Sequence, residues 1–153
     1  YVDFITSAPE RDKLCNVVIT VNSTLVEKRG LDDAALIKFV NSAIVYAAKE
    51  CTRRYIVPHA ASLARGLGLE PKRWSVRDTK RQYGSCSASG EISLSARLIF
   101  LPAELRDFII YHELAHMTEL NHSDAFHRLC DSYCGGRERE FESRLRSFKS
   151  PIF

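Results

Sequence analysis

The stretch IIYHELAHMTELNHSDAF, residues 109–126, carries three of the chain's five histidines, and a fourth, His127, follows it directly. His112 and His116 are four residues apart, so on an α-helix their imidazoles lie on one face and can reach one point. His122 is six residues beyond His116, too far along to join them if the helix continues. The spacing therefore predicts a helix that ends after its second histidine and a chain that turns back to bring in the third.

The reversal is expected between Thr118 and Asn121. Asn121 can help the chain to turn, because asparagine tolerates left-handed dihedral angles better than most residues. The complete run, HELAHMTELNH, has the three-histidine spacing of the metzincin pattern, but Glu119 stands where that pattern has glycine. This mismatch argues against membership of the metzincins.

A zinc ion is the natural occupant of such a cluster. Zinc accepts neutral imidazole at about 2.0–2.1 Å, and catalytic zinc sites use three protein ligands and leave the fourth position to water. Glu113, next to the first histidine, is placed to take a proton from that water. We predict one Zn²⁺ ion on His112, His116 and His122, with Glu113 as the catalytic general base. The alternative is a helix whose histidines only form hydrogen bonds at the margin of the core.

The length of 153 residues suits a single domain, and the composition, 45% hydrophobic and 27% charged, is that of a soluble globular protein. No apolar run approaches the roughly 20 residues needed to cross a bilayer, and the N-terminus lacks the features of a signal peptide. We therefore expect a cytoplasmic protein without a membrane partner. Its five cysteines are odd in number and follow no framework spacing, so we expect reduced thiols.

Periodicity outside the histidine stretch predicts an α+β fold. Residues 15–26 are rich in β-branched side chains, which predicts a strand or hairpin. Apolar residues at helical spacing predict a long amphipathic helix from Asp32, which Pro58 should kink or restart. Residues 72–100 change to a period of two around a turn at 87–90, as expected for a short antiparallel sheet.

Further helices are expected in the C-terminal half of the chain. The first begins at Pro102 and carries the first two histidines, and the second is capped by Ser123 and ends at Gly135. A third spans the tail, where Phe141 and Leu145 recur at helical spacing. The predicted active-site helix is therefore one of several helices that accompany the small sheet.

The segment QYGSCSASGEISLSARLIFLPAELRDFIIYHELAHMTELNHSDAF, residues 82–126, resembles the core of the YgjP-like zinc metallopeptidases, which are related to the SprT-like proteases. The shared features are a Gly-Ser-Cys strand segment, a His-Glu-x-x-His helix and a distal Asn-His-Ser. The resemblance covers residues 31–134 and implies a zincin-like fold, in which the active-site helix packs against a small antiparallel sheet with further helices. We therefore divide the chain into a divergent, strand-containing segment, residues 1–30, and a zincin-like metallohydrolase domain, residues 31–153.

Carried over by position, the resemblance implies zinc on His112, His116 and His122 and Glu113 as the catalytic base, in agreement with the spacing. It also implies a strand at the sheet edge, beside which an extended peptide can bind through main-chain hydrogen bonds. EISLS, residues 91–95, is the candidate edge, and a fully paired inner strand is the alternative.

Three positions depart from the family pattern. Gln82 and Tyr83 stand where the family has Arg-Trp, and His127 stands where it has an aromatic residue. These differences leave the predicted metal ligands intact and fall on the substrate side of the site. Tyr83 is a candidate electrophile and Cys86 a candidate border of the cleft, although packing roles would explain both.

The predicted function is that of a zinc metallopeptidase that cleaves peptide or protein substrates. Two alternatives remain open. The first is a zinc-dependent hydrolase of a non-peptide substrate such as a nucleotide phosphoanhydride, whose phosphates would need convergent cations. The candidates for these cations are Arg77, Lys80, Arg81 and Arg97. The second alternative is a non-catalytic zinc-containing module that binds protein or nucleic acid, in which Cys130 or Cys134 would complete a closed four-ligand site.

Overall fold

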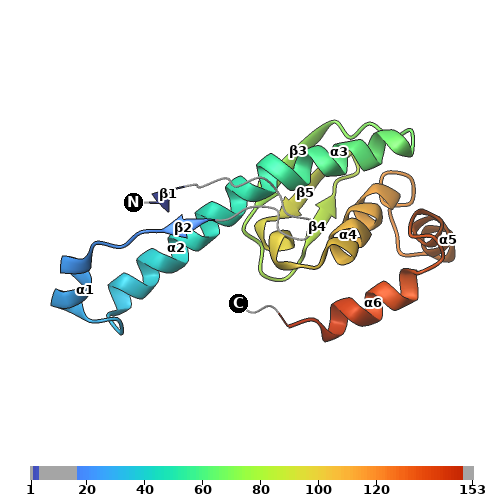
Figure 1. Ribbon diagram of the computed structural model, residues 1–153. Coiled ribbons are helices and arrows are strands. Elements are labelled where there is room, and N and C mark those ends of the chain that lie inside the picture. Colours follow the sequence, from blue (N-terminus) through green and yellow to red (C-terminus); the bar gives the residue numbers. More distant parts are fainter. Residues whose placement is uncertain (1, 4–16, 150–153) are drawn as a thin grey trace.

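A long helical arm, a small sheet and a group of shorter helices build the molecule (Figure 1). This computed structural model describes residues 2–3 and 17–149. Its strands are β1 (Val2–Asp3), β2 (Val18–Ile19), β3 (Arg73–Arg77), β4 (Gly84–Cys86) and β5 (Glu91–Ser95). Its helices are α1 (Ser23–Arg29), α2 (Ala34–Cys51), α3 (Val57–Gly66), α4 (Ala103–Ala115), α5 (Asp124–Tyr133) and α6 (Glu138–Ser147), with a π-helical segment (Thr52–Ile56) and a 3-10 helix (Ala96–Phe100). The predicted α+β class is confirmed, and within the described ranges no helix has the length and apolar character to cross a bilayer.

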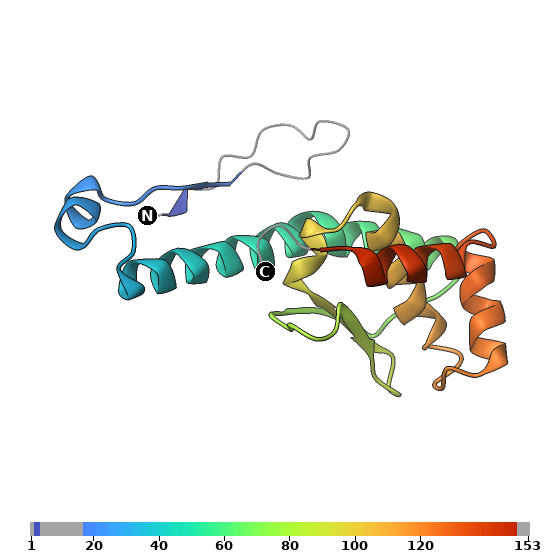
Figure 2. The same ribbon diagram turned by 90° about the horizontal axis from the view of Figure 1, so that it is seen from below.

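The helical arm consists of α2, the π-helical segment and α3. Asp33 caps α2 one residue later than predicted, and its carboxylate accepts a hydrogen bond of 2.9 Å from the Leu36 N–H. Pro58 stands in the first turn of α3, directly after the π-helical segment, and the arm continues through this point without a break. The predicted restart is therefore wrong: the helix changes its hydrogen-bond pattern in the turn before the proline and then runs on. The N-terminal half of the arm projects beyond the sheet (Figure 2) and exposes Phe39 and Tyr46.

The predicted strand at residues 15–26 is wrong over its second half. β2 contains two residues and pairs antiparallel with β1, and helix α1 begins at Ser23. The Asn22 side chain accepts a hydrogen bond of 2.9 Å from the Thr24 N–H, and this cap favours a helix that the β-branched composition does not reveal. Residues 15 and 16 lie outside the described part of the chain.

The sheet has the strand order β3-β5-β4. β4 and β5 form an antiparallel hairpin, but β3 runs parallel to β5, so the prediction of a wholly antiparallel sheet is wrong. Period-two alternation reports which face of a strand is buried and carries no information on strand direction. EISLS is also not the predicted edge, because it forms the central strand β5; in the described ranges the edge beside α4 is β4.

The core lies between the sheet, the C-terminal part of the arm and α4. Ile92 and Leu94 of β5 and Ile110 and Leu114 of α4 are each at most 1% exposed. Burial of each such side chain contributes on the order of 1.5–3 kcal/mol to stability. α5 and α6 also pack against α4, with Phe126 of α5 fully buried. α4 is therefore held from several sides, which fixes the direction of the side chains that it presents.

The cysteines of the chain differ in state. Cys51 is disulfide-bonded, so the prediction of reduced thiols is wrong for this residue. Cys86, Cys130 and Cys134 are free, and Cys15 lies outside the described residues. An odd cysteine count still leaves room for a pair, so the count does not reveal this bond.

Candidate metal centre

The turn after α4 brings the predicted histidines together. α4 ends at Ala115, earlier than expected, and its C-cap His116 still has right-handed dihedral angles. The Glu119 N–H then donates to the Ala115 carbonyl at 2.9 Å. Asn121 takes no left-handed conformation, because in the described residues positive φ angles occur only at glycines. The predicted reversal is present, but its assigned cause is wrong.

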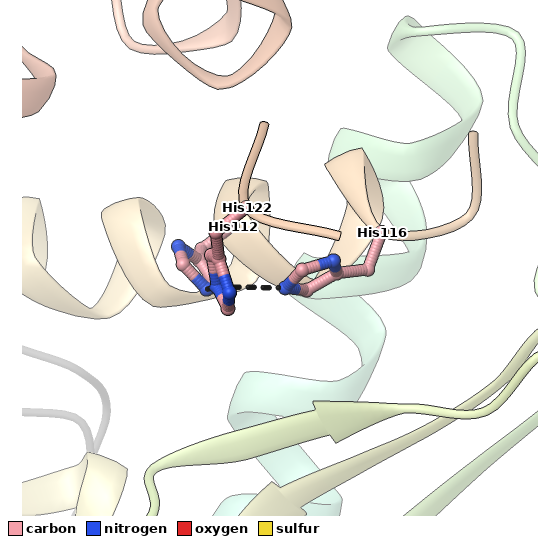
Figure 3. Close-up of side chains that lie close together, drawn as sticks. All are labelled: His112, His116 and His122. Atoms are coloured by element: carbon pink, nitrogen blue, oxygen red, sulfur yellow. Dashed lines mark hydrogen bonds between the residues drawn. The ribbon is translucent and has the colours of Figure 1, made fainter. Parts of the chain in front are cut away.

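The three imidazoles converge on one point (Figure 3). The Nε2 atom of His122 is 3.1 Å from Nε2 of His116 and 3.1 Å from Nε2 of His112. Tetrahedral ligands about 2.05 Å from a zinc ion lie about 3.3 Å apart, so these separations suit that ion. His116 Nδ1 donates to the Glu119 carbonyl at 2.9 Å, which leaves its Nε2 lone pair directed toward the cluster. These three side chains could therefore hold a zinc ion.

Phe126 packs against all three imidazoles. Its ring centroid is 4.4 Å from that of His116, 4.9 Å from that of His112 and 4.8 Å from that of His122. The ring lies in the first turn of α5, whose N-terminus is capped by Ser123 as predicted. Periodicity assigns Phe126 only to the apolar face of that helix, and nothing in the sequence shows its contact with the histidines.

Two of the three clustered histidines, His112 and His122, have lowered pKa values. The pKa of His112 is lowered to about 4, first by burial and then by the neighbouring histidines. The pKa of His122 is also lowered, again first by burial and then by His116 and His127. Neutral imidazole is the form that binds a metal. At neutral pH His112 and His122 therefore present their lone pairs without first having to lose protons.

Glu113 lies buried between α4 and β4. The residue is 6% exposed, and burial raises the pKa of its carboxyl group to about 7. A Cβ atom built on Gly84 would lie 2.7 Å from both Cγ and Oε1 of Glu113, a distance that real Cβ contacts do not show. Only glycine therefore permits this approach of β4 to the carboxyl group. Gly84 belongs to the Gly-Ser-Cys segment singled out in the sequence, but packing alone reveals what it contacts.

The histidines and Glu113 line a cleft of about 510 Å³. The β4 edge forms one wall, and α6 contributes Glu142, Leu145 and Arg146 to the lining. The contribution of α6 was not predicted, because the tail helix shows only an amphipathic pattern in the sequence. The cleft therefore combines a strand edge, the histidine cluster and a charged helix.

Tyr83 and Cys86, the two candidates from the strand segment, both line this cleft. The pKa of the Cys86 thiol is raised, first by burial and then by the charge of Glu113. The thiol therefore stays protonated near neutral pH and is a poor nucleophile. Its position matches the predicted border of the cleft.

His127 and the two C-terminal cysteines do not join the cluster as further donors. His127 Nδ1 is 2.9 Å from a carboxylate oxygen of Glu138. Cys130 and Cys134 are buried in the core. In the described ranges no cysteine or carboxylate joins the three clustered histidines as a fourth donor within 4.8 Å. The closed four-ligand arrangement with a cysteine is therefore not observed.

The candidate phosphate-binding cations do not converge on the cleft. Lys80, Arg81 and Arg97 line a separate hollow, and Arg77 lines neither. The hollow and the cleft share two lining residues, Gln82 and Tyr83. The two cavities are therefore neighbours along the segment that leads into β4.

Residues 18–148 match the family model described as YgjP-like, metallopeptidase domain. Among solved structures, the chain is similar to a crystal structure of the metallopeptidase zymogen of Pyrococcus abyssi abylysin, with 27% sequence identity and a TM-score of 0.48. That match covers 59% of this chain and 88% of the other. A comparison with curated proteins finds no match. The residues matched by the family model include the histidine cluster, β4 and α6.

Proposed function

Because the chain belongs to the YgjP-like metallopeptidase family, we propose that it is a zinc-dependent peptidase that cleaves peptide or protein substrates. In this proposal His112, His116 and His122 bind the zinc ion and Glu113 is the general base. The observation that carries it is the approach of three Nε2 atoms, with 3.1 Å between His122 and each of the others, beside a buried carboxyl group.

The donor set supports a catalytic ion over a structural one. Structural zinc sites are closed by four protein ligands, whereas catalytic sites keep one position for water or substrate. The cluster has three imidazole donors, and within the described ranges no further histidine, cysteine or carboxylate completes it. The orientation of His116 by the Glu119 carbonyl is the kind of outer contact that supports a metal ligand.

The chemistry of peptide cleavage divides between the ion and the chain. A zinc ion, when bound, polarises the scissile carbonyl and lowers the pKa of water to about 7. Glu113 removes a proton from the attacking water and passes it to the leaving nitrogen as the C–N bond breaks. Burial supports this role, because it raises the carboxyl pKa to about 7 and so suits both acceptance and release of a proton near neutral pH.

The strand edge supports an extended peptide as substrate. β4 is paired with β5 on one side, and in the described part of the chain its other side carries no strand. A peptide that lies along this side forms main-chain hydrogen bonds with little dependence on its sequence. Tyr83, Gly84 and Ser85 line the cleft there, so such a peptide would pass directly over Glu113.

Hydrolysis of a nucleotide phosphoanhydride has less support. A triphosphate carries several negative charges and needs convergent cations at the reacting centre. Among the described residues that line the cleft, Arg146 is the single lysine or arginine. Lys80, Arg81 and Arg97 lie in the neighbouring hollow instead.

Metal analysis paired with activity assays tests the proposed function. Wild type and Glu113→Gln should each retain one zinc ion per chain, and only the wild type should cleave casein. Loss of the base should reduce kcat by about 10²- to 10⁴-fold, the range in which general acid–base catalysis contributes. Undiminished cleavage by Glu113→Gln would remove this residue from the role of base. Turnover of nucleoside triphosphates without any cleavage of casein would favour the phosphoanhydride alternative.

A further inference from the structure

A hollow of about 300 Å³ lies next to the cleft and is lined by cations. We call it the basic hollow; its lining residues are Thr79, Lys80, Arg81, Gln82, Tyr83, Arg97, Phe100, Phe148 and Lys149. Four of these residues are lysine or arginine, and within the described ranges none is aspartate or glutamate. The net charge of the whole chain is +3, so this gathering of positive charge is local and does not reflect an overall basic composition.

The cations of the basic hollow differ from those elsewhere on the surface. Arg137 and Arg144, for example, both form ion pairs with Glu104. In the basic hollow, by contrast, no carboxylate of the described residues lies within 4.0 Å of the charged nitrogens of Lys80, Arg81 or Lys149. Only Arg97 has such a neighbour, with its Nε 3.6 Å from Asp78. The three other cations are thus available for an external anion.

Hydrogen bonds from the core hold the backbone that carries Lys80 and Arg81. The buried Ser95 donates from its hydroxyl to the Thr79 carbonyl at 3.0 Å and from its N–H to the Tyr83 carbonyl at 2.8 Å. The Thr79 hydroxyl in turn donates to the Gln82 carbonyl at 2.7 Å. Lys80 and Arg81 lie between these anchored positions. Their backbone is therefore held in place before any ligand binds, which lowers the entropic cost of binding.

The position of the basic hollow relative to Glu113 indicates the source of the anion. Gly84 contacts Glu113, and Arg81 is three residues before it in the chain. Three residues span at most about 10 Å, so the Arg81 backbone lies within that distance of Gly84, and Tyr83 lines both the hollow and the cleft. A peptide extended along β4 would cover it with residues about two to four positions from the scissile bond. The volume of the hollow, about 300 Å³, suits a single side chain better than a continuous polyanion.

We propose that the basic hollow is a specificity site that binds an acidic side chain of the peptide substrate, two to four residues from the bond that is cleaved. The inference rests on the proposed peptidase function and narrows its substrate class to peptides with an aspartate or glutamate at that distance. Lys80 and Arg81 supply the hydrogen-bond donors to the carboxylate, and charge-assisted bonds of this type are stronger than neutral ones. The two residues touch only the flank of the substrate and take no part in bond cleavage.

Paired peptides test the proposal on the zinc-loaded enzyme. Each pair is identical except for glutamate or glutamine at one position, and the position is moved from four residues before to four residues after the scissile bond. We expect one position at which the glutamate peptide has a kcat/KM about tenfold higher, through a lower KM. In the double variant Lys80→Gln, Arg81→Gln this advantage should disappear, while the glutamine peptide is cleaved as by the wild type. The advantage should also decrease as the salt concentration rises, because exposed charges are screened.

A double variant of exposed cations outside the basic hollow, Arg65→Gln with Lys72→Gln, is the matched control and should keep the full advantage. Equal cleavage of glutamate and glutamine peptides at every position would overturn the specificity site while leaving the peptidase function intact. Retention of the preference by Lys80→Gln, Arg81→Gln would overturn it as well. Failure of the zinc-loaded wild type to cleave any peptide would reject both proposals. The wild type could instead bind nucleoside triphosphate more tightly than the glutamate peptide, and lose this binding in Lys80→Gln, Arg81→Gln. That result would show that the basic hollow binds a phosphate rather than a carboxylate, and it would reject the inference.

Discussion

Two groups of side chains near the cleft have donor atoms close enough to surround a metal ion, and they differ in charge. His112, His116 and His122 form the first group, and His127, Glu138 and Glu142 form the second. In the first group burial lowers the histidine pKa values of His112 and His122. In the second the pKa of His127 is raised, chiefly by its hydrogen bond to Glu138.

The comparison shows how the surroundings decide the role of a histidine. An imidazole that lies among other imidazoles and is partly removed from water favours its neutral form and keeps a lone pair for a metal. An exposed imidazole beside a carboxylate favours its protonated form and serves as the cation of an ion pair. We therefore expect the first group to bind zinc and the second to act as an ion pair between the half-exposed His127 and the buried Glu138.

The largest expected effect comes from removal of the third histidine of the first group. His122→Ala leaves two donors from α4 and its C-cap, so the bound zinc should be lost and the peptidase activity should fall by at least about a thousandfold. Metal content after gel filtration and casein cleavage measure both effects. His59→Ala removes an exposed histidine that pairs with Asp107 and should change neither. Full zinc content in His122→Ala would contradict the proposal that the first group, and not the second, binds the zinc ion.

A second large effect is expected at the contact between β4 and Glu113. In Gly84→Ala the new methyl group would lie 2.7 Å from the Glu113 carboxyl group, so strand or side chain must shift. A displacement on the order of 1 Å can reduce kcat about 10²-fold, while the zinc ligands are untouched. Steady-state kinetics and metal analysis together distinguish a displaced Glu113 from a loss of zinc. Gly66→Ala, where a Cβ meets nothing within 4 Å, should keep the activity of the wild type.

The buried carboxyl group also predicts how the stability of the metal-free protein depends on pH. The folded pKa of Glu113 is about 7 and its unfolded value is 4.5, so between these pH values the native state binds more protons. The free energy of unfolding should therefore fall as the pH rises through this window, by roughly 3 kcal/mol for the full shift. Glu113→Gln lacks this contribution, so its stability relative to wild type should increase from pH 4.5 to pH 8. Urea unfolding after removal of metal measures the difference.

The quantity to follow is the difference in unfolding free energy between wild type and Glu113→Gln as a function of pH. His112 changes the stability of each protein with pH in the direction opposite to Glu113. Its pKa is about 4 in the folded state, so the unfolded state binds more protons between pH 4 and 6.5. This contribution cancels when the variant is compared with the wild type. A difference that stays constant from pH 4.5 to pH 8 would contradict the burial of an ionisable Glu113.

The smallest effect is expected in the second group. His127→Gln keeps a hydrogen-bond donor for Glu138 and removes the positive charge. Because the pKa of His127 is raised in the folded state, its contribution to stability is complete below pH 6.5 and is lost as the pH rises through the folded value. The side chain is 44% exposed, so the variant should lose less than about 1 kcal/mol at pH 6 and still less at pH 9. Loss of zinc or activity in this variant would show that the second group belongs to the metal centre.

Local signals predicted the parts of the structure that depend on neighbours in the chain. The pair His112 and His116 follows from helical spacing, and the cap at Ser123 follows from the preference of serine for that position. Pro58 likewise marks the place where the arm passes from π-helical to α-helical geometry. Each of these features is decided by residues within about one helical turn, which the sequence displays directly.

The parts that were missed depend on contacts between distant segments. Position 84 requires glycine because Glu113, which is far from it in sequence, packs against its Cα. The edge position of β4 depends on which strands pair with each other in the sheet. Glu142 and Arg146 reach the cleft because α6 packs against α4. The periodicity of a single element fixes its buried face, but it does not identify the element that covers this face.

The most direct test of the zinc assignment is a crystal structure of the zinc-loaded protein with anomalous diffraction measured at the zinc edge. We predict one strong anomalous peak about 2.0–2.1 Å from the Nε2 atoms of His112, His116 and His122, with solvent at the fourth position. A peak between His127 and Glu138, with none at the three clustered histidines, would contradict the account.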